Sequence, residues 1–286
     1  MTGGEILKKL NGWFWFLLPS IALFAFTVAF PFFSGIHIAF TDWDGISKTY
    51  QFVGLGNFTA MFKDKNIVSS IKVTLLFALG CTVFNNVLAL SLAVILNQKF
   101  KGRNFFKTIF FVPMALSAVL AAFVWGFIDR NILSGTILSH SLLGSPSTVI
   151  LGIIIIALWN GIGSNIMIYM AGLTNIPGDY YEAADIDGAG GWTRFRYITL
   201  PLLGPSFTMC VTLTLTSALR EFGTTMAATG GGPARSSEML SILIYKNLFS
   251  YQKAGYGQAI ALVFMFLLMV IGIGLTRFFR SREVEM

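Results

Sequence analysis

The sequence predicts an all-α integral membrane protein with about six transmembrane helices. Charged residues supply only 12% of the 286 residues, about half of the roughly 25% that is usual in soluble domains. The mean hydropathy of +0.72 is high, and the charges leave six long charge-free windows between them. Because so few charges cannot cover the surface of a soluble fold, the chain is expected to lie in a membrane.

Each of the six windows has room for a membrane-spanning helix. They comprise residues 10–41, 73–98, 108–128, 131–178, 197–219 and 254–276. A span needs about 20 predominantly apolar residues, each rising about 1.5 Å. We therefore expect spans near 13–40, 73–96, 108–128, 149–171, 198–219 and 258–276, within a membrane domain of residues 13–276. Serines and glycines fill the first part of the fourth window, which is expected to be a loop and not a seventh span.

The distribution of Lys and Arg predicts the orientation of the spans. Basic residues are denser in one set of connections, namely Lys8, Lys9, Lys99, Lys101, Arg103, Lys107, Arg194, Arg196, Arg277, Arg280 and Arg282. The positive-inside rule places these on the cytoplasmic side, and with them both termini, residues 1–12 and 277–286. The outer loops are then 41–72, 129–148 and 220–257. The first span is too long for the apolar part of a signal peptide and is expected to remain as an anchor.

Several function classes are excluded by what the sequence lacks. The net charge is +7, but the basic residues are scattered between apolar runs, so no nucleic-acid partner is expected. Cys81 and Cys210 both lie in apolar runs and are expected to pack there, with no metal site. The chain has no Gly-Lys pair and hence no phosphate-binding P-loop. We expect no catalytic residues and no bound cofactor, so any energy must come from a partner.

Two pairs of glycines lie inside predicted spans. Gly161 and Gly163 fall in the fourth span, and Gly272 and Gly274 in the last. Small residues let helices approach closely in a membrane, so all four are predicted to pack against neighbouring helices.

The inner loop at residues 172–197 has an unusual pattern. Pro177 and Gly178 favour a turn, and a short helix is predicted over 180–187. Gly188 is placed to end that helix in a left-handed conformation, and two further glycines allow a reversal toward the fifth span. Pro201 is expected in the first turn of that span, where proline is tolerated. The result is a helix-turn-helix projection suited to a partner's groove.

This loop resembles the EAA loop of permease subunits in binding-protein-dependent ABC importers, which have the type I importer permease fold. The likeness consists of residues 182–184, Gly188 after three further residues, and 198–201 after nine more. In that family the loop forms a coupling helix that docks on the ATPase subunit. The resemblance therefore assigns ATPase coupling to Glu182, Ala183, Ala184, Asp185, Gly188, Ile198, Leu200 and Pro201.

Other segments resemble the carbohydrate-uptake branch of these importers, the maltose and multiple-sugar type. They are residues 40–43, 52–58, 229–233, Tyr245 and 255–259. The larger maltose-type permease has extra N-terminal spans and a large outer insertion, and this chain has neither. The resemblance implies that the outer turn formed by Gly230, Gly231, Gly232 and Pro233 contacts the binding protein, although a plain connecting turn is the alternative.

Uncharged polar residues at membrane depth are the candidates for a substrate pathway, because sugars are bound by such groups. The preferred residues are Asn160, Ser164, Asn165, Thr214, Ser217 and Glu221. Two alternatives stay open. Hydroxyl side chains in spans also bond to their own helix backbone, and Glu221 could pair with Arg235.

The resemblance implies a permease subunit of an ATP-driven oligosaccharide or disaccharide importer in the bacterial cytoplasmic (inner) membrane. Its expected partners are a second permease subunit, a dimer of ATPase subunits that uses ATP and Mg, and an extracytoplasmic binding protein. Glycerol phosphate, a polyol or an acidic oligosaccharide is the alternative cargo, because Arg220, Arg235 and Lys246 lie toward the outer side. An independent channel or a membrane enzyme is the remaining alternative.

Overall fold

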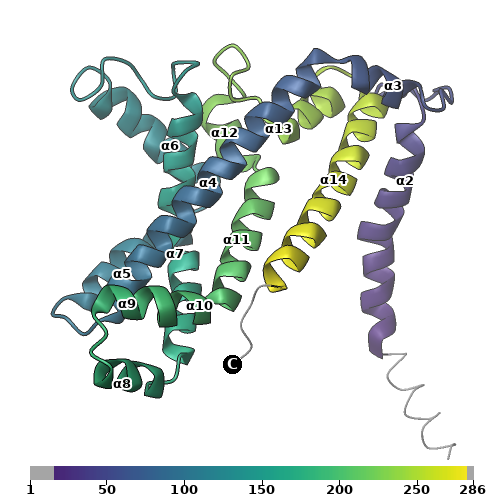
Figure 1. The fold of residues 1–286 in the computed structure, drawn as a ribbon. Coiled ribbons are helices and arrows are strands. Elements are labelled where there is room, and N and C mark those ends of the chain that lie inside the picture. The colour runs from purple at the N-terminus through teal and green to yellow at the C-terminus, as the bar shows by residue number, and fades with distance from the viewer. Residues whose placement is uncertain (1–15, 282–286) are drawn as a thin grey trace, which may run out of the picture. The chain divides into compact units, whose positions relative to one another are not determined.

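The computed structural model describes residues 16–281, and the regular elements within them are all helices (Figure 1). The predicted inner segment 1–12 and the last residues of the predicted tail lie outside the described residues. The described chain forms two compact units. The first unit contains the chain up to Asp64 and Ile244–Val263, and the second contains Lys65–Leu243 and the chain from Phe264 onward.

Within residues 16–281, four helices are long and apolar enough to cross a membrane, and two bent helix pairs bring the total to six if each pair counts as one span. The four are Phe16–Ala39, which ends in α2 (Phe30–Ala39), α4 (Lys65–Asn97), α7 (Val149–Asn175) and α14 (Ala254–Arg280). α4 begins eight residues before the predicted span and α14 runs four residues beyond it. The reason is that a Lys or Arg limits the hydrocarbon-buried part of a helix but does not end the helix, because its long side chain can reach the interface.

The predicted third span, 108–128, is not one straight helix. α5 (Arg103–Phe111) continues into a 3-10 turn at Val112–Ala115 and meets α6 (Ala118–Ile128) at 108°. Pro113 lies in the turn, and Ser117 begins α6 by accepting a hydrogen bond from the Leu120 N–H at 3.2 Å. The prediction counted apolar residues and overlooked this proline and N-cap pair.

The predicted fifth span, 198–219, is also bent. Gly191–Leu202 and α11 (Gly204–Leu219) meet at 67°. The first of these contains α9 (Gly191–Arg194), a π-helical segment (Phe195–Thr199) and α10 (Leu200–Leu202). Pro201 therefore lies before the bend, and Pro205 is the proline in the first turn of the apolar helix. The Pro201 expectation was wrong because it assumed a single helix on both sides of Leu203.

In the first unit, three separate sequence segments meet at the C-terminal end of α2. The Asn57 side-chain amide, in α3 (Gly56–Lys63), donates to the Ala39 and Thr41 carbonyls at 2.9 and 2.7 Å. The Gly255 N–H donates to the Trp43 carbonyl at 2.8 Å. These bonds satisfy carbonyls that the end of a helix leaves without partners. The segments that resemble sugar permeases around residues 40–43, 52–58 and 255–259 thus form one structural cluster.

The core of the second unit lies where α4, α7 and α11 pack together (Figure 1). Ala89 and Ala93 on α4 are fully buried in one cluster with Ile166 and Tyr169 on α7. Such small side chains allow two helix backbones to approach closely, which is the main source of packing energy between helices in a membrane. The second half of α14 contributes Leu268 and Ile271 to a neighbouring cluster in the same unit.

The predicted outer loop 129–148 is organised by one buried carboxylate. Asp129 is 2% exposed and begins the π-helical segment Asp129–Leu133. Its two oxygens accept hydrogen bonds from the Ser141 hydroxyl and from the Leu142 and Leu143 N–H groups, at 2.5 to 3.1 Å. Burial of a charge is stable only when it is bonded in this way, so the loop folds around Asp129.

The predicted outer loop 220–257 begins in the second unit and ends in the first, and it contains short helices. They are α12 (Gly223–Thr229), α13 (Leu240–Tyr245) and a π-helical segment at Lys246–Ser250.

The glycines of the predicted spans do not all serve packing. A Cβ on Gly163 would lie 2.7 Å from the Phe110 carbonyl oxygen, so close packing requires glycine there. Gly161 and Gly272 have ordinary contacts at 4.0 and 3.9 Å, and Gly274 has no atom within 4 Å. The packing prediction was wrong for Gly274, since spacing alone does not show which face of a helix has a neighbour.

Gly255→Ala is expected to destabilise the protein strongly. A Cβ at this position would lie 2.0 Å from the Thr41 carbonyl oxygen, which belongs to backbone and cannot swing away. Such overpacking costs about 1–3 kcal/mol. Thermal unfolding in detergent should show a lower midpoint than for the wild type. Gly274→Ala in the same helix is the matched control and should unfold at or slightly above the wild-type temperature; equal midpoints for both variants would contradict the close approach.

Candidate functional site

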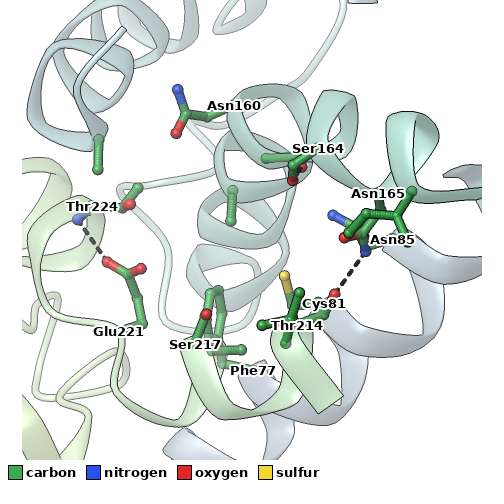
Figure 2. Close-up of a pocket in the computed structure, with 16 residues that line it drawn as sticks. Phe77, Cys81, Asn85, Asn160, Ser164, Asn165, Thr214, Ser217, Glu221 and Thr224 are labelled. Atoms are coloured by element: carbon green, nitrogen blue, oxygen red, sulfur yellow. Dashed lines mark hydrogen bonds between the residues drawn. The ribbon is translucent and has the colours of Figure 1, made fainter. Parts of the chain in front are cut away.

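A cleft of about 400 Å³ lies among five helices of the second unit (Figure 2). All six residues that the sequence predicted for a substrate pathway line it. The full lining is Phe77, Cys81 and Asn85 of α4, Ala118 of α6, Ala157, Asn160, Gly161, Ser164, Asn165 and Ile168 of α7, Leu213, Thr214, Ser217 and Ala218 of α11, Glu221, and Thr224 of α12. Polar side chains from different helices therefore face one space.

Asn165 joins three helices at the wall of the cleft. Its side-chain nitrogen donates to the Asn85 side-chain oxygen at 2.8 Å and to the Thr214 hydroxyl at 2.7 Å. The Thr214 hydroxyl donates in turn to the Cys210 carbonyl at 2.7 Å. Both N–H groups of Asn165 are thus used within the protein, and the network fixes α4, α7 and α11 relative to one another.

Asn160 holds the bend between α5 and α6. Its side-chain nitrogen donates to the Pro113 carbonyl at 2.8 Å and to the Leu116 carbonyl at 3.1 Å. The Pro113 carbonyl also accepts the Leu116 N–H at 3.1 Å, whereas the Leu116 carbonyl lies at the bend, where hydrocarbon offers no donor. Asn160 therefore has a structural role in addition to lining the cleft.

The remaining predicted residues differ in how their polar atoms are used. The Ser164 hydroxyl donates to the Gly161 carbonyl at 2.8 Å, which is the self-bonding alternative raised from the sequence. One Glu221 oxygen accepts the Thr224 N–H at 2.7 Å. Ser217 lies exposed on α11 at the cleft wall.

The proposed pairing of Glu221 with Arg235 is not what the structure has. Arg235 forms an ion pair with Glu238 and donates to the Asn66 side chain at 2.7 Å. Glu238 is buried, so an arginine held there neutralises an otherwise costly charge.

Sequence reasoning did not assign the other ten lining residues to the pathway, among them Phe77, Cys81, Asn85 and Thr224. The adjacent amides Asn85 and Asn86 were a usable signal, because two such polar side chains in a charge-free window need partners. Asn86 finds its partner in the Tyr169 hydroxyl at 2.7 Å. Cys81 was assigned to packing alone, and the structure also places it in the cleft wall.

The loop predicted to couple to an ATPase forms a compact hairpin. Its helix α8 runs Asp179–Ile186, within one residue of the prediction. Gly188 has a φ of +72°, and the chain closes with hydrogen bonds from the Gly188 N–H to the Asp185 carbonyl and from the Ala189 N–H to the Ala184 carbonyl. This pair of bonds is a Schellman motif, which ends helices at a left-handed glycine.

Two side-chain contacts fix the two arms of this hairpin to each other. Arg194 forms an ion pair with Asp185 at 2.5 Å, and the Tyr181 and Thr199 hydroxyls are hydrogen-bonded at 2.9 Å. Ala184 is buried, whereas Glu182 and Ala183 are exposed. Ile198 and Leu200 are half-buried in the second arm, and Pro201 is exposed.

The glycine-rich turn follows α12 directly. Gly230 and Gly231 have φ of +60° and +91°, and the peptide bond between Gly232 and Pro233 is cis. The Ser237 hydroxyl donates to the Gly232 carbonyl at 2.5 Å and is bonded to the Thr229 hydroxyl at 2.8 Å. The turn is therefore internally bonded, and it is adjacent in sequence to the helix that lines the cleft.

Long apolar helices with polar groups gathered in a cleft between them are typical of a multi-pass membrane protein. The chain belongs to the family of binding-protein-dependent transport system inner membrane components, whose sequence profile matches residues 85–283.

Two relatives cover nearly the whole chain. The probable starch degradation products transport system permease protein AmyD of Thermoanaerobacterium thermosulfurigenes is 35% identical over 96% of this chain and 97% of its own length. The multiple sugar-binding transport system permease protein MsmF of Streptococcus mutans is 34% identical over 96% of this chain and 95% of its own length.

A solved structure confirms the permease fold. A chain of a bacterial ABC transporter involved in the import of the acidic polysaccharide alginate superimposes with a TM-score of 0.84, covering 97% of this chain and 98% of that one at 22% identity. The type I importer permease fold predicted from the sequence is thereby established, and the family role is transport.

Asn160→Ala is expected to lower the thermal stability of the protein in detergent without any sugar present. The substitution leaves the Leu116 carbonyl without a donor and the Pro113 carbonyl with only the Leu116 N–H, at a cost of about 1–3 kcal/mol. Ser164→Ala removes only a bond within its own helix and should change the stability by less than about 0.5 kcal/mol. Thermal unfolding of the two variants in parallel checks this. Equal stability of Asn160→Ala and the wild type would show that the amide does not hold the bend.

Proposed function

We propose that this chain is a translocating permease subunit of an ATP-driven importer for an oligosaccharide or disaccharide. The observation that carries the proposal is the cleft, in which Asn85, Asn160, Asn165, Ser217 and Glu221 bring polar atoms together between spans. Hydroxyl-rich ligands are bound by such groups. The names of the two relatives, which refer to starch degradation products and to multiple sugars, support a saccharide as the cargo.

The chain performs no covalent chemistry in this proposal. ATP and Mg are used by a dimer of partner ATPase subunits, and the α8–α9 hairpin, including Glu182 and Gly188, docks on them. Support comes from its surface: the large apolar side chains of Ile186 and Trp192 are 88% and 73% exposed. Exposed apolar groups of this size favour a protein partner. Closure of the ATPases on ATP would then move the hairpin and switch access to the cleft.

The other parts of the complex follow from the family. A second permease subunit would complete the pathway, and an extracytoplasmic binding protein would deliver the sugar to the outer side. We assign the turn at Gly230–Pro233 to contact with that binding protein, since its internal hydrogen bonds present a defined surface next to α12. Both termini and the hairpin would face the cytoplasm, with the complex in the bacterial inner membrane.

Gly188→Val should abolish coupling, and Gly188→Asn should preserve it. A left-handed conformation costs an L-residue about 1–2 kcal/mol, and a β-branched side chain is the least suited to it, whereas asparagine adopts it readily. No atom lies within 4 Å of an added Cβ, so the effect is one of backbone conformation. The measurements are co-purification of a sugar-importer ATPase and ATP-dependent uptake of a radiolabelled α-glucan trisaccharide.

We expect Gly188→Val to insert normally in the membrane but to lose both ATPase co-purification and ATP-dependent uptake. Full ATP-dependent uptake by Gly188→Val would show that the hairpin does not couple the permease to the ATPase. Failure of the wild type to capture any ATPase would favour an independent channel or membrane enzyme instead.

A further inference from the structure

The cleft wall contains one formal charge. Among its lining residues Glu221 is the one with an acidic side chain, and none is Lys, Arg or His. The neighbouring Arg220 donates its Nε to the Thr216 carbonyl at 3.2 Å and does not line the cleft. Within residues 16–281 no ion pair involving Glu221 is formed, so its negative charge is not neutralised by a cation.

The hydrogen-bonding capacity of the wall is also uneven. The amide N–H groups of Asn160 and Asn165 are used on protein acceptors, while their side-chain oxygens accept no bond from the described part of the chain. One carboxylate oxygen of Glu221 accepts the Thr224 N–H, and the other accepts no hydrogen bond from the described part of the chain. Donors that remain are the Asn85 amide, the Ser217 and Thr224 hydroxyls and the weakly donating Cys81 thiol. The unused acceptors therefore include the one formal negative charge of the wall, whereas the unused donors are all neutral.

Such a wall suits a ligand that donates hydrogen bonds and carries no negative charge. Sugar hydroxyls can donate to the free oxygens and accept from the neutral donors. A carboxylate or phosphate would bring further acceptors, would find no cation, and would be repelled by Glu221 in a cleft where water screens charges less than in bulk. The position of Glu221 just after the end of α11, four residues after Ser217, puts its charge near an exposed hydroxyl of the wall.

We propose that Glu221 makes the cleft charge-selective, so that it admits uncharged, hydroxyl-rich saccharides and rejects acidic sugars and sugar phosphates. This inference rests on the proposed function, in which the cleft is part of the cargo pathway. It selects the neutral oligosaccharide over the glycerol phosphate and acidic oligosaccharide cargoes that the basic residues of the outer loop had left open. Arg235, the strongest of those candidates, is bound to Glu238 instead.

Thiol labelling tests the charge selectivity without any transport step. Ser217→Cys in a Cys81→Ala background supplies one accessible thiol in the cleft. Its reaction rates with a trimethylammonium and a sulfonate methanethiosulfonate reagent are compared, each divided by the rate with free cysteine. Adding Glu221→Gln should lower the ratio of cationic to anionic rates by about fivefold, the effect of removing one nearby charge in a partly hydrated site.

Asp44→Asn is the matched control, because it removes a carboxylate that does not line the cleft. It should leave the ratio unchanged. An unchanged ratio in Glu221→Gln, or an equal fall in both variants, would overturn the proposal.

Protection of the same thiol extends the test to sugars. A neutral α-glucan trisaccharide at millimolar concentration should slow the labelling of Cys at position 217, whereas a trisaccharide of glucuronic acid should slow it only after Glu221→Gln. Equal protection by both sugars in the presence of Glu221 would overturn charge selection. A charge-selective ratio combined with no protection by any sugar and no uptake would overturn the proposed function alone, so the two failures are distinguishable.

Discussion

Backbone polar groups that leave a helix inside a membrane must find partners within the protein, and this constraint governs the rest of the structure. The sharp bend between α5 and α6 frees the Leu116 carbonyl, and one side chain, Asn160, donates to it and to the Pro113 carbonyl, which also accepts the Leu116 N–H. Asn57 does the same for the carbonyls at the end of α2. An amide is suited to this task, because its two N–H groups can reach two acceptors at once.

The same constraint shapes the site. Amides needed to hold bent or crossing helices must lie at membrane depth, where they also give a cleft its polar wall. The side-chain nitrogens of Asn160 and Asn165 donate to protein acceptors. Their side-chain oxygens are therefore the polar atoms of these two residues that remain available to a ligand. The polar wall is a consequence of how the helices are held, and Glu221 adds the charge.

A continuous path of packed residues connects the cleft to the coupling hairpin. α7 carries Asn165 at the cleft, and its last turn packs with Leu203 and with Tyr181 of the hairpin in one apolar cluster. The Tyr181 hydroxyl then bonds to Thr199 before the second bend. A displacement of the hairpin would therefore move α7 and α11 together. These two helices contribute most of the residues that line the cleft.

Much of this organisation could be predicted from the sequence. Charge-free windows located the spans, since a buried charge is costly, and Gly188 was predicted to be left-handed because glycine has no Cβ. The six residues predicted for a pathway were chosen by their polarity, and all of them line the cleft. The bends could not be found by counting apolar residues, and Pro113 with Ser117 were overlooked. The role of Asn85 and the open surroundings of Gly274 depend on which helix faces pack against each other. Charge-free windows give no information on that packing.

The most direct test is a structure of the assembled importer, determined by electron cryomicroscopy with a neutral oligosaccharide trapped in transit. We expect the Asn160 and Asn165 side-chain nitrogens to keep their bonds to the bend and to Asn85 and Thr214, while sugar hydroxyls approach Glu221 and Ser217. Amide nitrogens turned away from the protein to bind the sugar, or a sugar that passes without contacting this cleft, would contradict the account.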